Sequence, residues 1–197
     1  MKGIICYYSG SGNTKLAIEY LAKKIKATNF ELFDITKGNI PNIQKYSIVG
    51  FATWADYGGA PQLMYNFINK IAKQKEKPAF LFNTFGFISG KIITDLAELV
   101  TYKGFSVISG FSLHTPENFP PLRKLRMTFD NYPKLSEIKT FDTYIETLNS
   151  QMEAISSGKK PRIVKLYSSL IDSIFPKKPR TSAKKDFGIQ NVNADLC

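Results

Sequence analysis

Short apolar runs alternate along the chain with stretches in which apolar residues recur every three or four positions. The apolar runs predict five strands, at 3–8, 30–34, 47–52, 79–83 and 106–113. The recurring stretches predict four helices, at 14–27, 61–72, 90–103 and 136–157. This alternation is typical of a doubly wound α/β fold, in which helices cover both faces of a parallel sheet.

The apolar positions of each predicted helix mark the face that should pack on the sheet. From the first helix to the last, they are Ala17, Leu21 and Ile25; Leu63, Phe67 and Ile71; Ile92, Leu96 and Val100; and Ile138, Phe141, Ile145, Leu148, Met152 and Ile155. The last set is the longest, so the final helix is the most clearly amphipathic of the four.

Composition narrows the class of protein. A chain of 197 residues is long enough for one substantial core. No apolar run approaches the length of a membrane span and no signal peptide is visible, so we expect a cytoplasmic protein. The two cysteines, Cys6 and Cys197, and the single histidine are not at metal-ligand spacing, so no metal site is expected.

The most informative motif follows the first predicted strand and opens the first helix. It reads Ser9-Gly10-Ser11-Gly12-Asn13-Thr14. Free backbone N–H groups at a helix start bind anions, and the helix dipole adds to the attraction. The hydroxyl and amide side chains add donors, and the two glycines allow the backbone to close around a phosphate. The motif favours a phosphomonoester site over a plain strand–helix turn.

Two other nucleotide motifs are excluded. A dinucleotide fingerprint would need glycine where Lys15 stands, and a P-loop would need a second glycine before that lysine. The motif instead resembles the FMN-phosphate loop of flavodoxins. The resemblance implies FMN as the cofactor and a flavodoxin-like three-layer sandwich. Its five-stranded parallel sheet would have the order 2-1-3-4-5, with the ligand at the carboxyl ends of the first and third strands.

The loops after the third and fourth predicted strands extend this resemblance to the two flavin-ring loops of flavodoxins. Aromatic side chains can stack on the flat isoalloxazine ring, and glycines beside them let a peptide rotate near flavin N5. In the fourth-strand loop, Phe87 stands where the family usually has a second glycine. The residues expected to bind the cofactor are Thr53, Trp54, Ala55, Tyr57, Gly58 and Gly59 in the first loop, and Asn83, Thr84, Phe85, Gly86, Phe87 and Gly90 in the second. Packing roles for Trp54 and Phe85 remain as alternatives.

The segment 114–135 has no clear periodicity and contains four prolines. Long structureless loops in compact domains are usually functional or disordered. This one is expected to cover the flavin ring or to receive a partner. His114 is a candidate proton relay to the flavin, with a structural role as the alternative.

The chain is strongly basic, and the charge is concentrated near its end. The net charge is +11, and residues 158–197 contribute nine Lys/Arg against three Asp. We expect residues 1–157 to form the FMN-binding domain and 158–197 a basic linker or tail. An amphipathic helix is expected at 163–175, which would dock on the domain, on another domain or subunit, or on an anionic membrane.

The tail and the residue sequences of the loops together resemble the flavodoxin half of flavodoxin–ferredoxin fusion proteins. That resemblance makes Cys197 an isolated first ligand of a [4Fe–4S] module. It implies an electron carrier whose partner is a redox protein with an acidic surface, such as a ferredoxin-type domain. The alternatives are an FMN-dependent NAD(P)H or quinone reductase and a flavin-free interaction domain. Nucleic acid binding is not expected, because no aromatic platform accompanies the charges.

Overall fold

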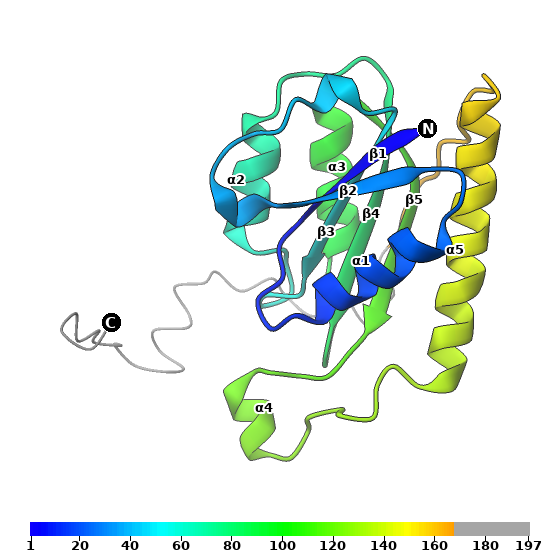
Figure 1. Cartoon of the computed structure of the whole chain (residues 1–197). Coiled ribbons are helices and arrows are strands. Elements are labelled where there is room, and N and C mark those ends of the chain that lie inside the picture. Colours follow the sequence, from blue (N-terminus) through cyan, green and yellow to red (C-terminus); the bar gives the residue numbers. More distant parts are fainter. Residues whose placement is uncertain (168–197) are drawn as a thin grey trace.

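The computed structural model describes residues 1–167 and contains one five-stranded parallel sheet (Figure 1). The strand order is β2-β1-β3-β4-β5, which confirms the predicted flavodoxin-like topology. The strands are β1 Lys2–Tyr7, β2 Asn29–Asp34, β3 Ile48–Trp54, β4 Lys77–Phe85 and β5 Phe105–His114. The order reverses between β1 and β3, so the two halves of the sheet diverge at the carboxyl ends of these strands.

Two strands extend two residues further toward their carboxyl ends than the sequence predicts. β3 continues through Trp54 and β4 through Phe85, because the parallel ladder pairs Thr53 with Asn83 and Trp54 with Thr84. Thr53, Asn83 and Thr84 are therefore buried strand residues rather than loop residues. Polar side chains begin where the apolar run of each strand ends, but the hydrogen bonds between the two strands continue past that point.

Four long helices cover the two faces of the sheet. They are α1 Asn13–Lys24, α2 Gln62–Lys70, α3 Ile92–Tyr102 and α5 Leu135–Ser156. The apolar faces of α1 and α5 form one core with one side of the sheet, and those of α2 and α3 form the second core with the other side (Figure 1). None of the helices within residues 1–167 is long and apolar enough to cross a bilayer.

The predicted packing faces are confirmed except for Leu63 of α2 and for Ile138 of α5, which is only half-buried and belongs to neither core. Met64 and Ile68 are fully buried, whereas Leu63 is 39% exposed. Because 3.6 residues complete a turn, the spacings of three and four put Met64, Phe67, Ile68 and the C-cap Ile71 on one stripe and leave Leu63 at its margin.

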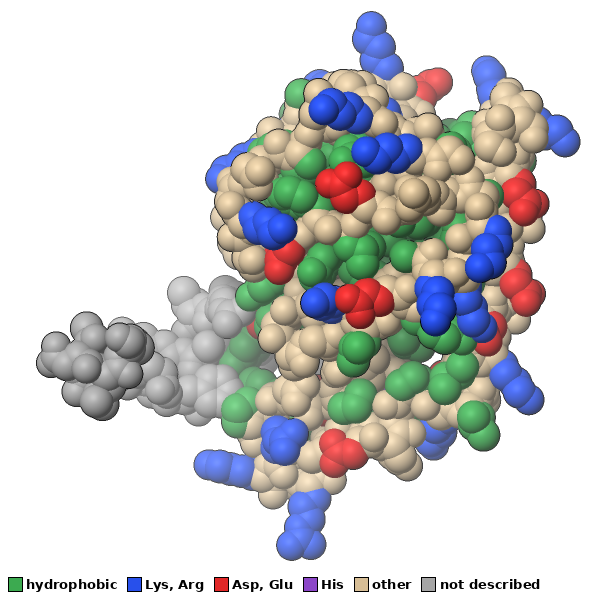
Figure 2. Space-filling model, in the orientation of Figure 1, with side chains coloured by type: hydrophobic (Ala, Val, Ile, Leu, Met, Phe, Trp, Pro, Cys, Tyr) green, Lys and Arg blue, Asp and Glu red, His purple; other side chains and the backbone are tan. Residues whose placement is uncertain are grey.

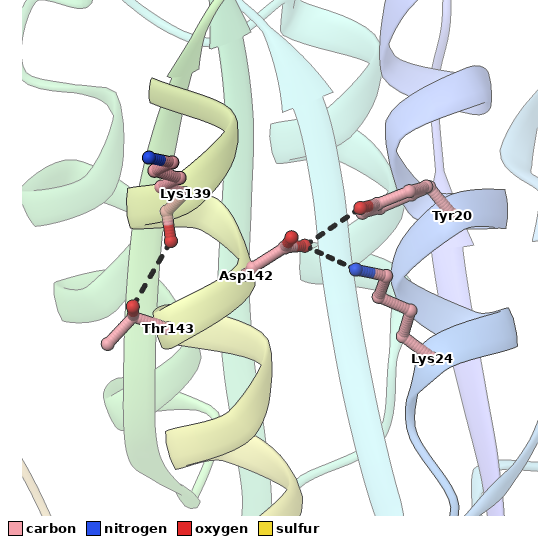
Figure 3. A network of polar contacts seen from close by, with 5 residues as sticks. All are labelled: Tyr20, Lys24, Lys139, Asp142 and Thr143. Carbon is pink, nitrogen blue, oxygen red and sulfur yellow. Dashed lines mark hydrogen bonds and ion pairs between the residues drawn. The ribbon is translucent and has the colours of Figure 1, made fainter. Parts of the chain in front are cut away.

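A polar contact joins α1 and α5, the two helices that cover the same face of the sheet, near their exposed edges (Figure 3). The Tyr20 hydroxyl and the Lys24 ammonium both donate to Asp142 Oδ1, each at 2.8 Å. The hydrogen bond from Lys24 lowers the pKa of the Asp142 carboxyl, and the bond from Tyr20 lowers it further. The next residue of α5, Thr143, donates its Oγ1 hydroxyl to the Lys139 carbonyl one turn earlier at 3.1 Å, a local bond that stays within the helix.

The connections between these elements are mostly irregular. Two short 3-10 turns, Ile35–Lys37 and Ile43–Lys45, lie in the crossover from β2 to β3. The long segment after β5 contains one short helix, α4 Pro120–Lys124, which the sequence did not predict.

The helix predicted at 163–175 is wrong for its first residues. Residues 161–167 are not helical, because Val164 donates its N–H to the Val107 carbonyl of β5 at 2.9 Å. Leu166 lies over Gly110, where any Cβ would overlap it. The rest of that helix and Cys197 lie outside the described residues.

Candidate functional site at the carboxyl ends of the strands

The phosphate-type loop has its predicted place between β1 and α1. Gly12 caps the helix with a left-handed φ of 96° and no side-chain cap, and its carbonyl accepts the Leu16 N–H at 3.0 Å. In the described part of the chain, the backbone N–H groups of residues 11–14 have no acceptor. The start of α1 therefore carries a cluster of unpaired donors together with the positive end of the helix dipole.

The polar side chains of this loop are used differently from one another. Thr14 is buried, and its Oγ1 lies 2.8 Å from Thr84 Oγ1 and 3.4 Å from the Thr53 carbonyl. Asn13 Nδ2 donates to the Pro116 carbonyl at 3.1 Å. Thr14 and Asn13 therefore brace the loop, whereas Ser9 Oγ accepts the Lys15 N–H at 3.2 Å and the Ser11 hydroxyl is exposed.

Trp54 lies across the phosphate-type loop. Its ring atoms come within 3.4–3.5 Å of the position that a Cβ on Gly10 would occupy, and its centroid is 6.0 Å from that of Tyr8. Trp54 Nε1 and the neighbouring Thr53 Oγ1 are both buried, and neither has a hydrogen-bond partner within residues 1–167. Unpaired buried polar atoms are costly, so their occurrence at this edge is consistent with a ligand-binding role.

The loop after β3 is a tight turn. Asp56 and Gly59 exchange both backbone hydrogen bonds, at 2.8 and 3.1 Å. The two central residues, Tyr57 and Gly58, have φ values of 52° and 77°, the combination that a type I′ turn requires. A left-handed conformation is costly for tyrosine, so the turn holds the aromatic ring in place at the expense of backbone strain.

The loops after β3 and β4 are packed directly against each other. Gly90 has a φ of 67°, and a Cβ there would overlap the backbone of Gly58. The Gly58 carbonyl accepts the Lys91 N–H at 3.2 Å. Gly90 is thus needed for close approach between the loops rather than as an open face for a ligand.

A closed ring of hydrogen bonds supports the loop after β4. Asn83 Nδ2 donates to Ser89 Oγ at 3.2 Å, Ser89 Oγ to Ser112 Oγ at 3.1 Å, and Ser112 Oγ to Asn83 Oδ1 at 2.6 Å. Asn83 is fully buried. Its side chain therefore positions the loop from below, which the sequence did not indicate because Ser112 is distant along the chain.

The segment after β5 folds back over all three loops. The Thr115 N–H donates to the Phe85 carbonyl at 2.8 Å. The Glu117 carboxylate accepts backbone N–H groups from Phe87, Asn118 and Phe119 at 2.8–2.9 Å. Glu117 is a residue that sequence reasoning missed, since its contacts depend on the loops meeting in space.

His114 stands at the end of β5 inside an aromatic cluster. Its ring stacks on Phe85 with centroids 4.9 Å apart and lies 3.9 Å from that of Tyr132. Nδ1 is 3.4 Å from the Glu137 carboxylate, and the buried Nε2 has no partner within the described residues. Phe85 is therefore engaged with His114, as well as being part of the loop that was predicted to contact the ligand.

The structure brings together most of the residues predicted for the site. Ser9, Gly10, Ser11, Gly12, Trp54 and Ala55 meet at the carboxyl ends of β1 and β3, with Tyr57, Gly58 and Gly59 in the adjoining turn and Phe85, Gly86 and Phe87 beside it. Thr14, Thr53, Asn83, Thr84 and Gly90 are buried beneath or between the loops. The arrangement offers an anion cradle beside aromatic side chains.

Comparison with known proteins supports this architecture. Residues 4–96, which contain all three loops, match a family model described as a flavodoxin domain. An uncharacterized protein of Methanocaldococcus jannaschii is 24% identical over 151 residues, covering 75% of this chain and 98% of that protein.

Solved structures give the same picture. A flavodoxin from the domain Archaea has a TM-score of 0.58 at 16% identity, covering 78% of this chain and 99% of that one. A Streptococcus pneumonia flavodoxin has a TM-score of 0.56 at 15% identity, covering 76% and 99%. Rubredoxin oxygen:oxidoreductase from Desulfovibrio gigas has a TM-score of 0.53 at 17% identity, and this chain spans about a third (36%) of its length. The chain therefore has the flavodoxin fold, and its residues 4–96 resemble a flavodoxin domain in sequence.

Proposed function

We propose that this protein binds FMN at the carboxyl ends of β1, β3 and β4 and transfers single electrons between redox proteins. The observation that carries the proposal is the set of unpaired N–H groups at residues 11–14, bordered by Trp54 and its unpaired Nε1. A phosphate supplies several acceptor oxygens to such donors, and a flat apolar ring suits the neighbouring aromatic side chains. FMN combines both groups in one molecule.

Each loop has a separate task in this proposal. The N–H groups of residues 11–14 and the Ser11 hydroxyl hold the phosphate. Trp54 and Tyr57 would lie beside the ring and exclude water from it. The hydrogen bonds around Asn83 hold the loop after β4 in place, and the backbone of that loop would bond to the polar edge of the flavin. Bound FMN supplies one-electron chemistry, and the surrounding protein sets its reduction potentials.

The turn after β3 limits which peptide is able to respond to the flavin. The Gly58 carbonyl is held by the Lys91 N–H, so rotating the peptide between Gly58 and Gly59 would break a hydrogen bond. The peptide between Tyr57 and Gly58 is the central one of the turn, and its rotation leaves both bonds between Asp56 and Gly59 intact. The central peptide is therefore the one whose rotation toward a bound flavin would preserve the hydrogen bonds of the turn.

The domain division follows from the same proposal. Residues 1–157 form the FMN-binding domain, and 158–197 form a basic linker that starts along the edge of β5. The partner is a redox protein with an acidic surface, of which a [4Fe–4S] ferredoxin-type domain is one kind. The net charge of +11 would accelerate encounter with such a surface.

The test is FMN binding followed by stepwise anaerobic photoreduction. We expect one FMN per chain and a broad long-wavelength absorption band that rises and then falls, the sign of one-electron steps. Direct passage to the fully reduced spectrum, with rapid reduction by NAD(P)H, would instead indicate a reductase. Absence of FMN binding would contradict both functions.

A matched pair of glycine variants separates ligand binding from general backbone strain. Gly12 and Gly38 have φ values of 96° and 82°, and a Cβ at either would meet nothing within 4 Å. Gly12→Ala and Gly38→Ala should therefore destabilise the fold similarly, by about 1 kcal/mol. Only Gly12→Ala should weaken FMN binding, which fluorescence titration measures. Equal FMN affinities in the two variants would contradict the assignment of the phosphate site.

A further inference from the structure

The segment that carries α4 ends in an exposed cationic turn, which we call the α4 knob (residues 120–127). Arg123, Lys124 and Arg126 are all exposed, and the side chain between the last two, Leu125, is 69% exposed. Within residues 1–167 none of these three cations forms an ion pair or a side-chain hydrogen bond. Figure 2 shows Lys and Arg side chains projecting from the lower end of the molecule, where α4 lies in Figure 1.

The knob has a defined backbone in spite of its exposure. The Met127 N–H donates to the Leu122 carbonyl at 2.9 Å and the Arg126 N–H to the Arg123 carbonyl at 3.0 Å, the paired bonds of a Schellman motif. Arg126 occupies the left-handed position with a φ of 58°, where glycine is the usual residue. The sequence thus has a cationic residue at a position where glycine would avoid the backbone strain.

The knob is tied directly to the proposed flavin loops. The Glu117 N–H donates to the Thr128 carbonyl at 2.7 Å, which closes the base of the segment. The Glu117 carboxylate holds the Phe87 N–H of the loop after β4. Phe119 lies edge to face on Tyr57, with ring centroids 5.5 Å apart. A protein bound to the knob would therefore lie beside the loops that hold the flavin.

The acidic groups of this segment are engaged locally. Glu117 accepts three backbone N–H groups, and Asp130 accepts the Thr128 hydroxyl at 2.7 Å. Their charges lie at the base of the segment, while the knob itself carries only positive charge. An exposed leucine among three cations has the composition of a small interface, with an apolar centre and a charged rim.

We propose that the α4 knob is the docking surface for a redox protein with an acidic face. This inference rests on the proposed function, because the partner is placed by its closeness to the flavin loops. The knob would recognise this partner through complementary charges that surround one apolar contact, at Leu125. Complementary charge mainly raises the association rate and fixes the orientation, so the effect should be large at low salt and small at high salt.

The test compares two variants with the same change in net charge. One replaces the knob cations, Arg123→Gln, Lys124→Gln and Arg126→Gln. The matched control replaces three exposed lysines at the amino ends of the strands, Lys45→Gln, Lys70→Gln and Lys75→Gln. The probe is a purified acidic [4Fe–4S] ferredoxin, and its binding is measured with FMN-loaded and with FMN-free protein at low and high salt.

At low salt we expect the knob variant to bind the ferredoxin roughly tenfold or more weakly than the unmodified protein, and the control variant to lose less than about threefold. Both differences should shrink at high salt. Equal losses in the two variants would overturn the proposal, because the effect would then come from net charge alone. Knob-dependent binding to anionic lipid vesicles or to single-stranded DNA of similar strength would also overturn it.

The FMN-free measurement keeps this test separate from the proposed function. If the chain does not bind FMN, the proposed function fails, and the loss of ferredoxin binding on FMN-free protein still reports on the knob. If FMN binds equally to all variants and ferredoxin binding does not depend on the knob, the docking surface alone is wrong. Equal FMN affinity in the variants also shows that they are folded.

Discussion

The interior of the sheet and its carboxyl end differ in the side chains that they bury. The central strands are lined with fully buried apolar side chains such as Ile4, Val49 and Phe80. At the carboxyl end, by contrast, lie the buried but unpaired Thr53 Oγ1, Trp54 Nε1 and His114 Nε2, three of the five such atoms within residues 1–167.

The same contrast holds for the backbone. Four non-glycine residues of the described chain have positive φ, and three of them, Tyr57, Arg126 and Phe129, lie in the loops at the carboxyl end. Strain and unpaired polar groups cost stability, and they persist where the surrounding structure holds them for a purpose. The interior therefore stabilises the fold, and the carboxyl end gives up stability to present a binding surface.

The largest expected effect tests the interior. Phe80 is fully buried and packs over Gly50, so Phe80→Ala should lower the free energy of unfolding by about 3–5 kcal/mol. FMN affinity of the folded protein should change little, because the side chain does not reach the loops. Urea unfolding measures the first quantity and fluorescence titration the second, with Tyr102→Ala, whose side chain is 71% exposed, as the control. A large loss of FMN affinity in Phe80→Ala would break the contrast between the two regions.

The next effect tests the carboxyl end. Trp54→Ala removes the ring beside Gly10, so FMN should bind roughly tenfold or more weakly, as expected for the loss of one stacking contact. The free energy of unfolding should fall by less than in Phe80→Ala, because Trp54 is only partly buried. Trp54→Phe should restore much of the affinity. Unchanged FMN affinity in Trp54→Ala would mean that the tryptophan merely packs on the loop.

A smaller effect measures the strain at the knob. Arg126→Gly should raise the free energy of unfolding by about 0.5–1 kcal/mol, because glycine adopts a φ of 58° without strain and the arginine side chain has no partner within residues 1–167. The same change one turn earlier, Arg123→Gly, lies inside α4 and should lower it by about 1 kcal/mol. Thermal unfolding of the two variants measures whether each change raises or lowers the free energy of unfolding. A loss of stability in both would show that Arg126 is not strained.

The smallest effect concerns the exposed contact between α1 and α5. Hydrogen bonding to Lys24 lowers the folded-state pKa of Asp142, so this contact contributes stability above the unfolded pKa, and the contribution is lost as pH falls through the folded value. Asp142→Asn should therefore be slightly less stable than the unmodified protein at neutral pH and equal to it in strong acid. Urea unfolding at both pH values measures the difference, and a difference that grows in acid would contradict the sign.

Periodicity and turn residues are local signals, so the sequence was sufficient to predict the five strands and the three loops of the site, and the resemblance of those loops to flavodoxins supplied the strand order. Leu63 was assigned to the core because the prediction followed positions four apart, whereas the buried stripe combines spacings of three and four through Met64, Phe67, Ile68 and Ile71. The bracing roles of Asn83 and Glu117 were out of reach, because each depends on residues that are distant along the chain. The fold of residues 161–167 was missed for the same reason, since the edge of β5 overrides the helical pattern there.

The central claim, that the carboxyl end is an FMN site, is tested most directly by following backbone amide resonances during FMN titration. The account predicts that the largest shifts fall on residues 9–14, 54–59 and 84–90. The amides of Lys45 and Lys75, at the opposite end of the strands, should remain unchanged. Saturating FMN without shifts at residues 9–14, or with the largest shifts at the amino ends of the strands, would contradict it.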